Sequence, residues 1–274
     1  MIVDMCVHPA VAMETPEALK ERVRVLYHAT YGKTLRFTEE EILTELDAAG
    51  VDIGVLRAQI STVGNRVSNE SIARLVKKYP DRLVGLAGLD PTRGKPSVGE
   101  FERLVEQGFK GLILGPSFLH FYPNDEKCFP VYAKAVELDV PVVFPSYWTS
   151  PTTTLKYGHP SVYDDVAVAF RQLNIVVDAL GGGLFEQAFV LACKNPNVYL
   201  TTSFCPALYP AGLFEKHLKT LKASWVSLDR LLFAGEYPLV SALKTRCIIE
   251  QAGLSLDDKR RVLGENAARL LKLR

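Results

Sequence analysis

Eight short apolar runs, each followed by a stretch with helical periodicity, divide this chain from one end to the other. Runs of this length between amphipathic stretches are typical of buried parallel strands alternating with helices. We expect the strands at 2–7, 51–56, 83–89, 111–114, 141–144, 175–177, 198–201 and 231–233. Eight strand–helix units in series predict an α/β fold of the TIM-barrel type, a closed (β/α)₈ barrel.

Local signals at helix ends support this division. Thr38 with Glu41, and Ser97 with Glu100, have the spacing of a capping box, in which a hydroxyl and a carboxylate satisfy the first free N–H groups of a helix. Apolar residues at helical spacing precede Gly50, which is typical of a helix that ends at a glycine. We therefore expect helices to begin after Thr38 and after Ser97.

The connections differ in length on the two sides of the predicted barrel. Helix-to-strand connections are short, whereas strand-to-helix segments are long at 8–37, 115–127 and 145–161. In a barrel these long segments lie at the carboxyl ends of the strands, where active sites of such barrels occur. We expect the ligand site there, and we assign residues 1–274 to one domain because no linker or change in composition divides the chain.

Composition restricts the class of partner. The chain has 32 Lys and Arg against 31 Asp and Glu, so it offers no broad positive field for nucleic acid. No apolar run approaches the roughly 18 residues of a membrane span, and the start lacks a basic leader, so we expect a cytoplasmic protein with a small-molecule substrate. The five cysteines are scattered without a CxxC pair, which argues against disulfides.

The two ends of the chain carry recognisable motifs. The first strand reads VDMCVHP at 3–9, the last reads LLFAGEYP at 231–238, and VLGENAARLL follows at 262–271. This resembles the amidohydrolase-2 family, the group of aminocarboxymuconate semialdehyde decarboxylase, which opens with D-x-H-x-H and closes with F-x-S-D-x-P and I-L-G-x-N-A. Segments 77–82, 85–91, 108–112, 121–125 and 181–183 also look like family positions. The resemblance implies a TIM barrel and a hydrolase or nonoxidative decarboxylase.

The metal ligands of the family are only partly present. By the resemblance, His8 keeps its position, whereas Cys6 and Glu236 stand where the family has a histidine and an aspartate. Pro145 and Ala179 replace two further histidines and supply no donor atom. We therefore predict a site without a metal cofactor. Zinc held by Cys6, His8 and Glu236 is the alternative, because each is a competent ligand type.

These three residues are our predicted catalytic group. Cys6 and His8 are two apart on a strand, so they share a face, and Glu236 neighbours them when the barrel closes. His8 would act as general acid or base, with Glu236 orienting it or acting as base itself, and Cys6 as a nucleophilic thiolate. A buried inert thiol and a structural salt bridge are the alternatives for Cys6 and Glu236.

Further residues are candidates for binding substrate. Arg57 ends the second strand and could hold a carboxylate bidentately, with a surface ion pair as its alternative. Tyr122, Tyr147 and Trp148 lie on the long segments and could pack against an organic ligand, or simply fill space. Asp178 differs in strand parity from Ala179, so we expect it to point toward the helices.

These observations predict an amidohydrolase-like enzyme that acts without a metal on a small carboxylated or cyclic organic substrate. Lactone hydrolysis and decarboxylation by acid–base catalysis are both compatible with the resemblance. A non-catalytic small-molecule-binding barrel and a zinc hydrolase are the alternatives, because fold alone does not guarantee chemistry. The resemblance also makes a homo-oligomer possible.

Overall fold

Eight parallel strands form one sheet in the order β1 to β8, each paired with its neighbours in sequence. The computed structural model describes residues 1–9, 12, 17–62, 66–145 and 153–273. The barrel prediction is confirmed. The seven parallel pairings from β1–β2 to β7–β8 each join strands that are consecutive in the sequence. The strands are β1 (Val3–Val7), β2 (Ile53–Arg57), β3 (Leu83–Gly88), β4 (Leu112–Ile113), β5 (Val142–Phe144), β6 (Ile175–Val177), β7 (Val198–Thr201) and β8 (Leu231–Leu232).

Backbone hydrogen bonds between β1 and the segment after β8 close the sheet. Met5 N–H donates to the Phe233 carbonyl at 3.0 Å, and Glu236 N–H donates to the Cys6 carbonyl at 3.1 Å. His8 N–H donates to the carbonyl of Tyr237 at 3.0 Å. The first and last strands thus meet at their carboxyl ends, although they are more than two hundred residues apart in sequence.

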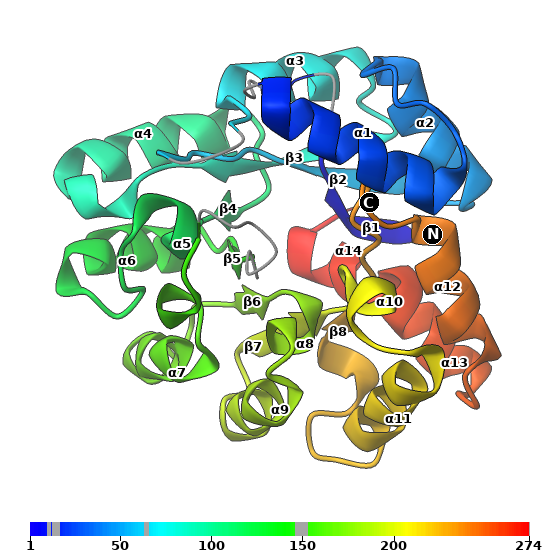
Figure 1. Cartoon of the computed structure of the whole chain (residues 1–274). Coiled ribbons are helices and arrows are strands. Elements are labelled where there is room, and N and C mark those ends of the chain that lie inside the picture. Colours follow the sequence, from blue (N-terminus) through cyan, green and yellow to red (C-terminus); the bar gives the residue numbers. More distant parts are fainter. Residues whose placement is uncertain (10–11, 13–16, 63–65, 146–152, 274) are drawn as a thin grey trace.

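Helices surround the strands, as Figure 1 shows. The longer ones are α1 (Glu17–Tyr31), α2 (Glu39–Ala48), α3 (Asn69–Lys78), α4 (Lys95–Glu106), α6 (Phe129–Glu137), α7 (Pro160–Ala169), α9 (Phe185–Lys194), α11 (Ala211–Lys222) and α12 (Ala242–Gln251). Shorter turns are α5 (Pro116–Leu119), α8 (Ala179–Gly182), α10 (Cys205–Leu208), α13 (Leu256–Arg260), the π-helix η6 (Arg261–Glu265), α14 (Asn266–Leu271), and the 3₁₀ turns η2 (Pro91–Arg93), η3 (Glu126–Cys128), η4 (Leu155–Tyr157) and η5 (Leu228–Arg230). Helices α1, α5 and α8 all follow carboxyl ends of strands.

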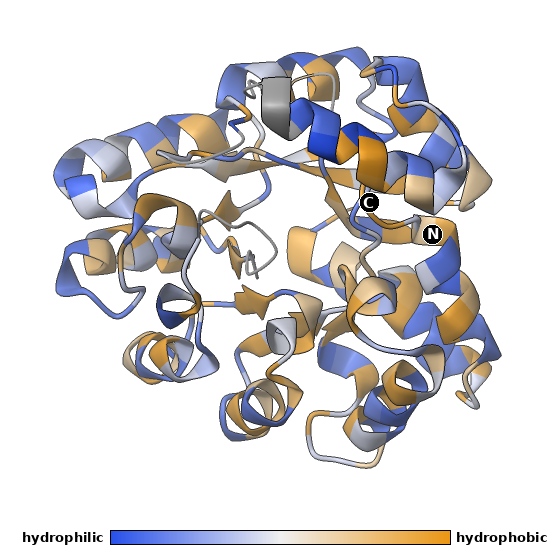
Figure 2. Cartoon of the chain, viewed as in Figure 1, coloured by the Kyte–Doolittle hydropathy of each residue, from blue (hydrophilic) through white to orange (hydrophobic). Residues whose placement is uncertain are grey.

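Two hydrophobic clusters form the core. The larger one lies between the strands and the surrounding helices, and the smaller one fills the inside of the barrel. The inner cluster combines strand residues such as Met5, Val55 and Val176 with Ala267 and Leu270 of α14, so this helix packs against the residues inside the barrel. Figure 2 shows the corresponding apolar strands and inward helix faces. Polar side chains nearer the carboxyl ends of the strands pack on top of this inner cluster.

The two capping predictions had different outcomes. Thr38 is the N-cap of α2 and forms the predicted capping box with Glu41, and the helix ends before Gly50, whose φ is +60°. The second prediction was wrong, because α4 begins at Lys95 and its N-cap is Gly94. Ser97 lies inside this helix, and its hydroxyl donates to the Asp90 carbonyl instead.

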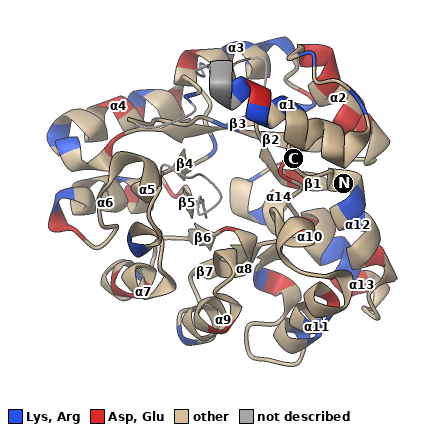
Figure 3. Ribbon diagram, viewed as in Figure 1, with Lys and Arg blue, Asp and Glu red and all other residues tan. Residues whose placement is uncertain are grey.

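In the ribbon of Figure 3, positions of Lys and Arg and positions of Asp and Glu are interspersed along the outer helices. Among the described residues, no helix combines the length and apolar character that crossing a membrane requires. All five cysteines are described and none forms a disulfide; Cys6, Cys128 and Cys205 are buried.

A close backbone contact generates a stability prediction. A Cβ on Gly264 of η6 would lie 2.0 Å from the Met1 carbonyl oxygen and 3.1 Å from the Ile2 Cα. Ile2 cannot move away easily, since its carbonyl accepts from both Asp52 and Ile53. Gly264→Ala should therefore cost about 1–3 kcal/mol of unfolding free energy, the usual range for overpacking.

Gly99 of α4 provides the matched control, since a Cβ there would meet nothing within 4 Å. Gly99→Ala should stabilise the fold by about 1 kcal/mol, because alanine is the better helix former. Chemical denaturation of both variants makes the comparison. Equal effects at the two glycines would contradict the close contact at η6.

Candidate functional site

The barrel carries a polar layer directly above its inner hydrophobic cluster. Side chains alternate along a strand, so a residue two positions beyond an inward apolar residue also faces inward. Val55 and Val176 belong to the inner cluster, and the same strand faces continue toward the carboxyl ends. The polar residues gathered in this layer are Cys6, His8, Arg57, Asp178, Thr201 and Glu236.

Cys6, His8 and Glu236 converge as the sequence predicts. The Cys6 thiol donates to Glu236 Oε2 at 3.0 Å, and His8 Nε2 lies 2.8 Å from Glu236 Oε1. Cys6 Sγ lies 3.5 Å from His8 Nε2. Cys6 is fully buried, whereas the side chains of His8 and Glu236 are 11% and 13% exposed. The cluster therefore opens narrowly toward the carboxyl ends of the strands.

The surroundings shift the pKa values of the Cys6 thiol and the Glu236 carboxyl group in opposite directions. Burial raises the pKa of the Cys6 thiol well above its usual value, and the nearby Arg57 charge only partly offsets this. Burial would also raise the pKa of Glu236, but the charge and hydrogen bond of His8, with Arg57 and Cys6, hold it below the usual value. A neutral thiol thus donates to a carboxylate, which weakens the case for Cys6 as a thiolate nucleophile in this arrangement.

Asp4 holds the backbone beside Cys6 and beside Glu236 in place, and the sequence patterns did not identify it as a site residue. Its Oδ1 accepts from Cys6 N–H at 2.9 Å and from Gly235 N–H at 2.8 Å, so one carboxyl group holds both strand ends. Oδ2 is buried without a hydrogen-bond partner among the described residues. Burial raises the pKa of Asp4 to about 7 despite the two backbone donors. The first letter of the D-x-H-x-H pattern was the signal available for it.

Arg57 and Asp178 form a buried ion pair across the barrel. Both terminal guanidinium nitrogens donate to Asp178, and Arg57 Nε donates to the Met5 carbonyl at 2.7 Å. The expectation that Asp178 points toward the helices was wrong. Val176 faces the barrel interior and Asp178 follows it on the same strand face. The reference residue for parity, Ala179, has left the strand and has a φ of +53°.

A network of hydroxyl groups supports Asp178, and sequence reasoning also missed it. Thr201 Oγ1 donates to Asp178 Oδ1 at 2.9 Å and lies 3.0 Å from Ser203 Oγ. Ala179 N–H points at both hydroxyl oxygens, each at 3.2 Å. Ala179 and Leu180 both have positive φ, a conformation that costs about 1–2 kcal/mol for a residue with a side chain. Alternation along β7 was the signal for Thr201 and Ser203.

The predicted substrate-binding residues have different surroundings. Arg57 is 1% exposed and bound to Asp178, so its role toward substrate stays a prediction. Tyr122 is 43% exposed, and its ring lies 4.9 Å from that of Tyr157. Tyr147 and Trp148 lie outside the described residues, and their binding role also stays a prediction.

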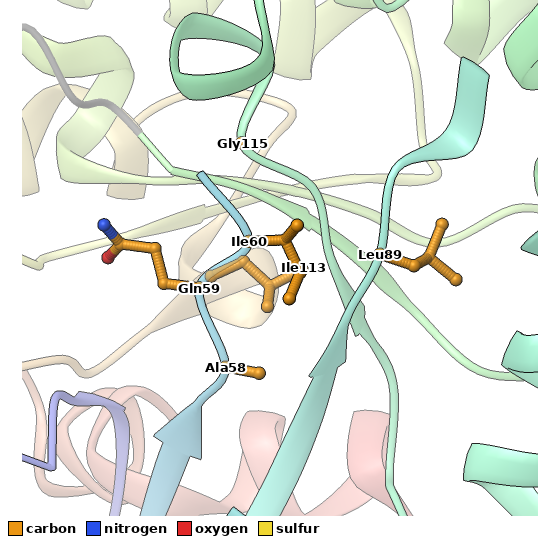
Figure 4. Close-up of a pocket in the computed structure, with 6 residues that line it drawn as sticks. All are labelled: Ala58, Gln59, Ile60, Leu89, Ile113 and Gly115. Carbon is orange, nitrogen blue, oxygen red and sulfur yellow. The ribbon is translucent and has the colours of Figure 1, made fainter. Parts of the chain in front are cut away.

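A small hollow lies at the carboxyl ends of β2, β3 and β4. Figure 4 shows that Ile60 and Ile113 face this space, whereas the Gln59 amide extends away from them. The residues that line it are Ala58, Gln59, Ile60, Leu89, Ile113 and Gly115. It has room for about one water molecule, which is too little for an organic substrate. The Cys6–His8–Glu236 cluster is therefore the better candidate for the reactive centre.

The same cluster fits a metal ion. One potential ligand atom from each of Cys6, His8 and Glu236 lies within 4.8 Å of the others. It is the one such group of three His, Cys, Asp or Glu side chains in the part of the chain that the structure describes. Three protein ligands with a narrow opening are the arrangement of catalytic zinc sites, where a water or substrate completes the coordination.

Backbone strain at Glu236 generates a prediction. Its φ is +114°, a region that residues with a Cβ avoid at a cost of roughly 1–3 kcal/mol. Glu236→Gly and Glu236→Ala both remove the carboxylate, but only glycine relieves the strain. We expect the glycine variant to be more stable than the alanine variant by about 1–2 kcal/mol in chemical denaturation.

Glu102 within α4 is the control position for this comparison. In a helix the order reverses, because glycine is about 1 kcal/mol worse than alanine. If glycine were also the less stable variant at position 236, the strain assigned to Glu236 would be refuted.

The buried ion pair generates a second prediction. Arg57→Met should cost about 3–5 kcal/mol, because it leaves the Asp178 carboxylate buried without its main partner. Adding Asp178→Asn should recover part of that loss, so the two substitutions are not additive in a double-mutant cycle. Unfolding in urea measures all three variants.

The exposed Lys219–Glu215 pair of α11 is the matched control. Lys219→Met should change the unfolding free energy by less than about 1 kcal/mol, as is usual for solvated ion pairs. Additive effects of the Arg57 and Asp178 substitutions would contradict a coupled pair inside the barrel.

The fold is shared with solved structures over nearly its full length. An uncharacterized TIM-barrel protein from Bordetella bronchiseptica is 20% identical, with a TM-score of 0.82 over 99% of this chain and 98% of that chain. A dihydroxybenzoic acid decarboxylase from Polaromonas is 18% identical, with a TM-score of 0.72 over 99% and 97%. A 5-carboxyvanillate decarboxylase from Novosphingobium aromaticivorans is 18% identical, with a TM-score of 0.71 over 99% and 95%.

These comparisons correct the prediction of a site without a cofactor. Both decarboxylases were crystallised with bound manganese, which points to a metal cofactor in barrels of this kind. The prediction counted the lost donors at Pro145 and Ala179 and gave too little weight to the three that remain. Those three converge closely enough to hold one ion.

The sequence also matches a protein family over nearly the whole length of the chain. The family model described as amidohydrolase, that of the amidohydrolase-2 family, matches residues 3–273. The matched region includes both terminal motifs and all eight strands. The chain therefore belongs to the amidohydrolase-2 family.

Proposed function

We propose that this protein is a metal-dependent enzyme that removes the carboxylate group of a small organic acid, as a nonoxidative decarboxylase. The observation that carries the proposal is the convergence of Cys6, His8 and Glu236 at the carboxyl ends of β1 and β8. This end of the barrel is where enzymes of this fold place their chemistry. Decarboxylases among its structural neighbours, and its family, support the reaction class.

Cys6, His8 and Glu236 would hold the metal ion. When bound, a divalent ion supplies positive charge that polarises a substrate oxygen and stabilises negative charge formed during the reaction. The ligand set suits this role, because an ion would displace the proton of the Cys6 thiol, and one thiolate and one carboxylate would then balance the charge of a divalent ion. The neutral imidazole of His8 contributes a third donor.

Glu236 is the best-placed group for moving a proton. It has two oxygens, one directed to His8 and the other to Cys6, so one can act as ligand while the other accepts or returns a proton. Decarboxylation requires such a group, because the carbon that loses carbon dioxide must gain a proton in its place. The hydrogen bonds of His8 and Cys6 and the Arg57 charge hold the pKa of this carboxylate below its usual value.

The residues around the cluster would hold it in place and exclude water. Asp4 fixes the backbone of Cys6 and Gly235, and the Arg57–Asp178 pair fills the opposite side of the barrel. Fixed polar groups stabilise charge in a dry site without reorganising during the reaction. The substrate would enter from the carboxyl ends, where Tyr122, Tyr147 and Trp148 remain candidates for contacting its organic part.

Turnover of a defined panel tests the proposal. Purified protein is assayed for carbon dioxide release from 2,6-dihydroxybenzoate, 5-carboxyvanillate and related hydroxybenzoates, and for hydrolysis of lactones. We expect decarboxylation that is lost in chelator and restored by a divalent ion. His8→Ala should reduce it more than tenfold, since even changes to partners of metal ligands alter activity about 10–100-fold.

His28→Ala is the control, because His28 is an exposed histidine of α1. This variant should keep wild-type turnover. Hydrolysis of lactones without decarboxylation would replace the proposed reaction by a hydrolase. Thermal stabilisation by the acids without any turnover would instead indicate a binding protein.

A further inference from the structure

The potential metal ligands of this site include a sulfur atom, unlike a site built only from nitrogen and oxygen atoms. Each of the three ligand residues contributes a different atom: the Cys6 sulfur, a His8 ring nitrogen and a Glu236 oxygen. We propose that Cys6 is the residue that selects the metal, so that the site takes zinc in preference to manganese. This inference rests on the proposed function, since it concerns the ion that the same three residues would hold.

The first argument is the chemical softness of the donors. Thiolate sulfur is a soft ligand that favours zinc, whereas manganese favours carboxylate, carbonyl and water oxygens. Cys6 lies beside the other two potential ligands. Its sulfur is 3.0 Å from Glu236 Oε2 and 3.5 Å from His8 Nε2, so an ion bound between the three groups lies within reach of the sulfur.

The second argument is the number of donors. Zinc is commonly bound by three protein ligands plus one open position, whereas manganese favours an octahedral set of oxygen-rich ligands. Pro145 and Ala179 have no donor atoms in their side chains, and both are buried. Asp178 is the nearest carboxylate on the opposite wall, but Arg57 and Thr201 already bind its oxygens. Within the described residues, the side-chain ligands thus number three.

The third argument is that the sulfur is fixed in place. Cys6 is fully buried, its N–H donates to Asp4, and its carbonyl accepts from Glu236 N–H. These contacts fix the backbone that carries the sulfur, and burial together with the contacts of the thiol to His8 and Glu236 restricts rotation of the side chain away from the site. The two proteins that were crystallised with manganese are only 18% identical to this chain, so they do not determine its metal.

Competition between the two ions tests this assignment directly. Protein stripped with chelator is equilibrated with Zn²⁺ and Mn²⁺ together, and the bound metals are measured after removal of free ions. Wild type should bind about one zinc ion per chain, with little manganese. In Cys6→His the preference for zinc over manganese should fall at least tenfold, since even outer-shell changes alter metal affinity about 10–100-fold.

Cobalt provides a spectroscopic readout that is independent of activity. Wild-type protein loaded with Co²⁺ should show a sulfur-to-cobalt charge-transfer band in the near ultraviolet, and Cys6→His and Cys6→Ser should both lack it. Cys205→Ser is the matched control, because Cys205 is equally buried but outside the three-residue group. It should keep both the band and the zinc preference. Cys6→Ser, being closest in size, keeps the test decisive if the histidine variant does not fold.

The outcomes separate this inference from the proposed function. An unchanged metal preference in Cys6→His, or cobalt bound to wild type without the charge-transfer band, would overturn the role of Cys6. Decarboxylation by a manganese-loaded enzyme that shows no preference for zinc would keep the proposed function and reject the selection of metal. Wild-type protein that binds neither ion would reject the metal site itself.

Discussion

The hydrogen bonds that join β1 to the segment after β8 are the interaction on which the site depends. They bring Cys6 and His8 against Glu236, which lies more than two hundred residues away in the sequence. Asp4 reinforces the same junction, since one of its oxygens accepts from a backbone N–H on each side. The same hydrogen bonds therefore close the barrel and bring the side chains of Cys6, His8 and Glu236 together.

The charges inside the barrel form a second, linked constraint. Burying Arg57 or Asp178 alone would be very unfavourable, so each requires the other, and the pair in turn ties β2 to β6 across the interior. The guanidinium also lies close enough to Cys6 and Glu236 to influence the pKa of both groups. Such a layer contributes little net stability, because desolvation offsets attraction. Its effect is to fix the positions and charges of the groups that face the opening.

The sequence predicted the barrel and the convergence of Cys6, His8 and Glu236 because both follow from periodic patterns and strand order. Eight apolar runs specified the strands, and alternation placed Cys6 and His8 on one face. The Arg57–Asp178 pair was missed for a physical reason: parity was judged from Ala179, where the chain has already turned into a left-handed conformation. Ser97 was misplaced because Gly94 and Pro96 start α4 earlier than its hydroxyl suggests. Pairings across a barrel and the exact ends of strands depend on tertiary contacts that no local pattern records.

The backbone strain at Glu236 and the lack of donor atoms at Pro145 and Ala179 both distinguish the two sides of this site. Glu236 combines an unfavourable φ with a carboxylate that is only 13% exposed, and strained backbone of this kind is common at functional sites. Pro145 and Ala179, by contrast, have no donor atoms to position, and the space across from the cluster is taken by an internal ion pair. One wall of the barrel thus carries three potential metal ligands, Cys6, His8 and Glu236. The opposite wall carries the Arg57–Asp178 pair, whose charges neutralise each other. Among the described residues, the inner hydrophobic cluster and α14 fill the barrel on the other side of the three donor groups, so the cluster faces the carboxyl ends of the strands.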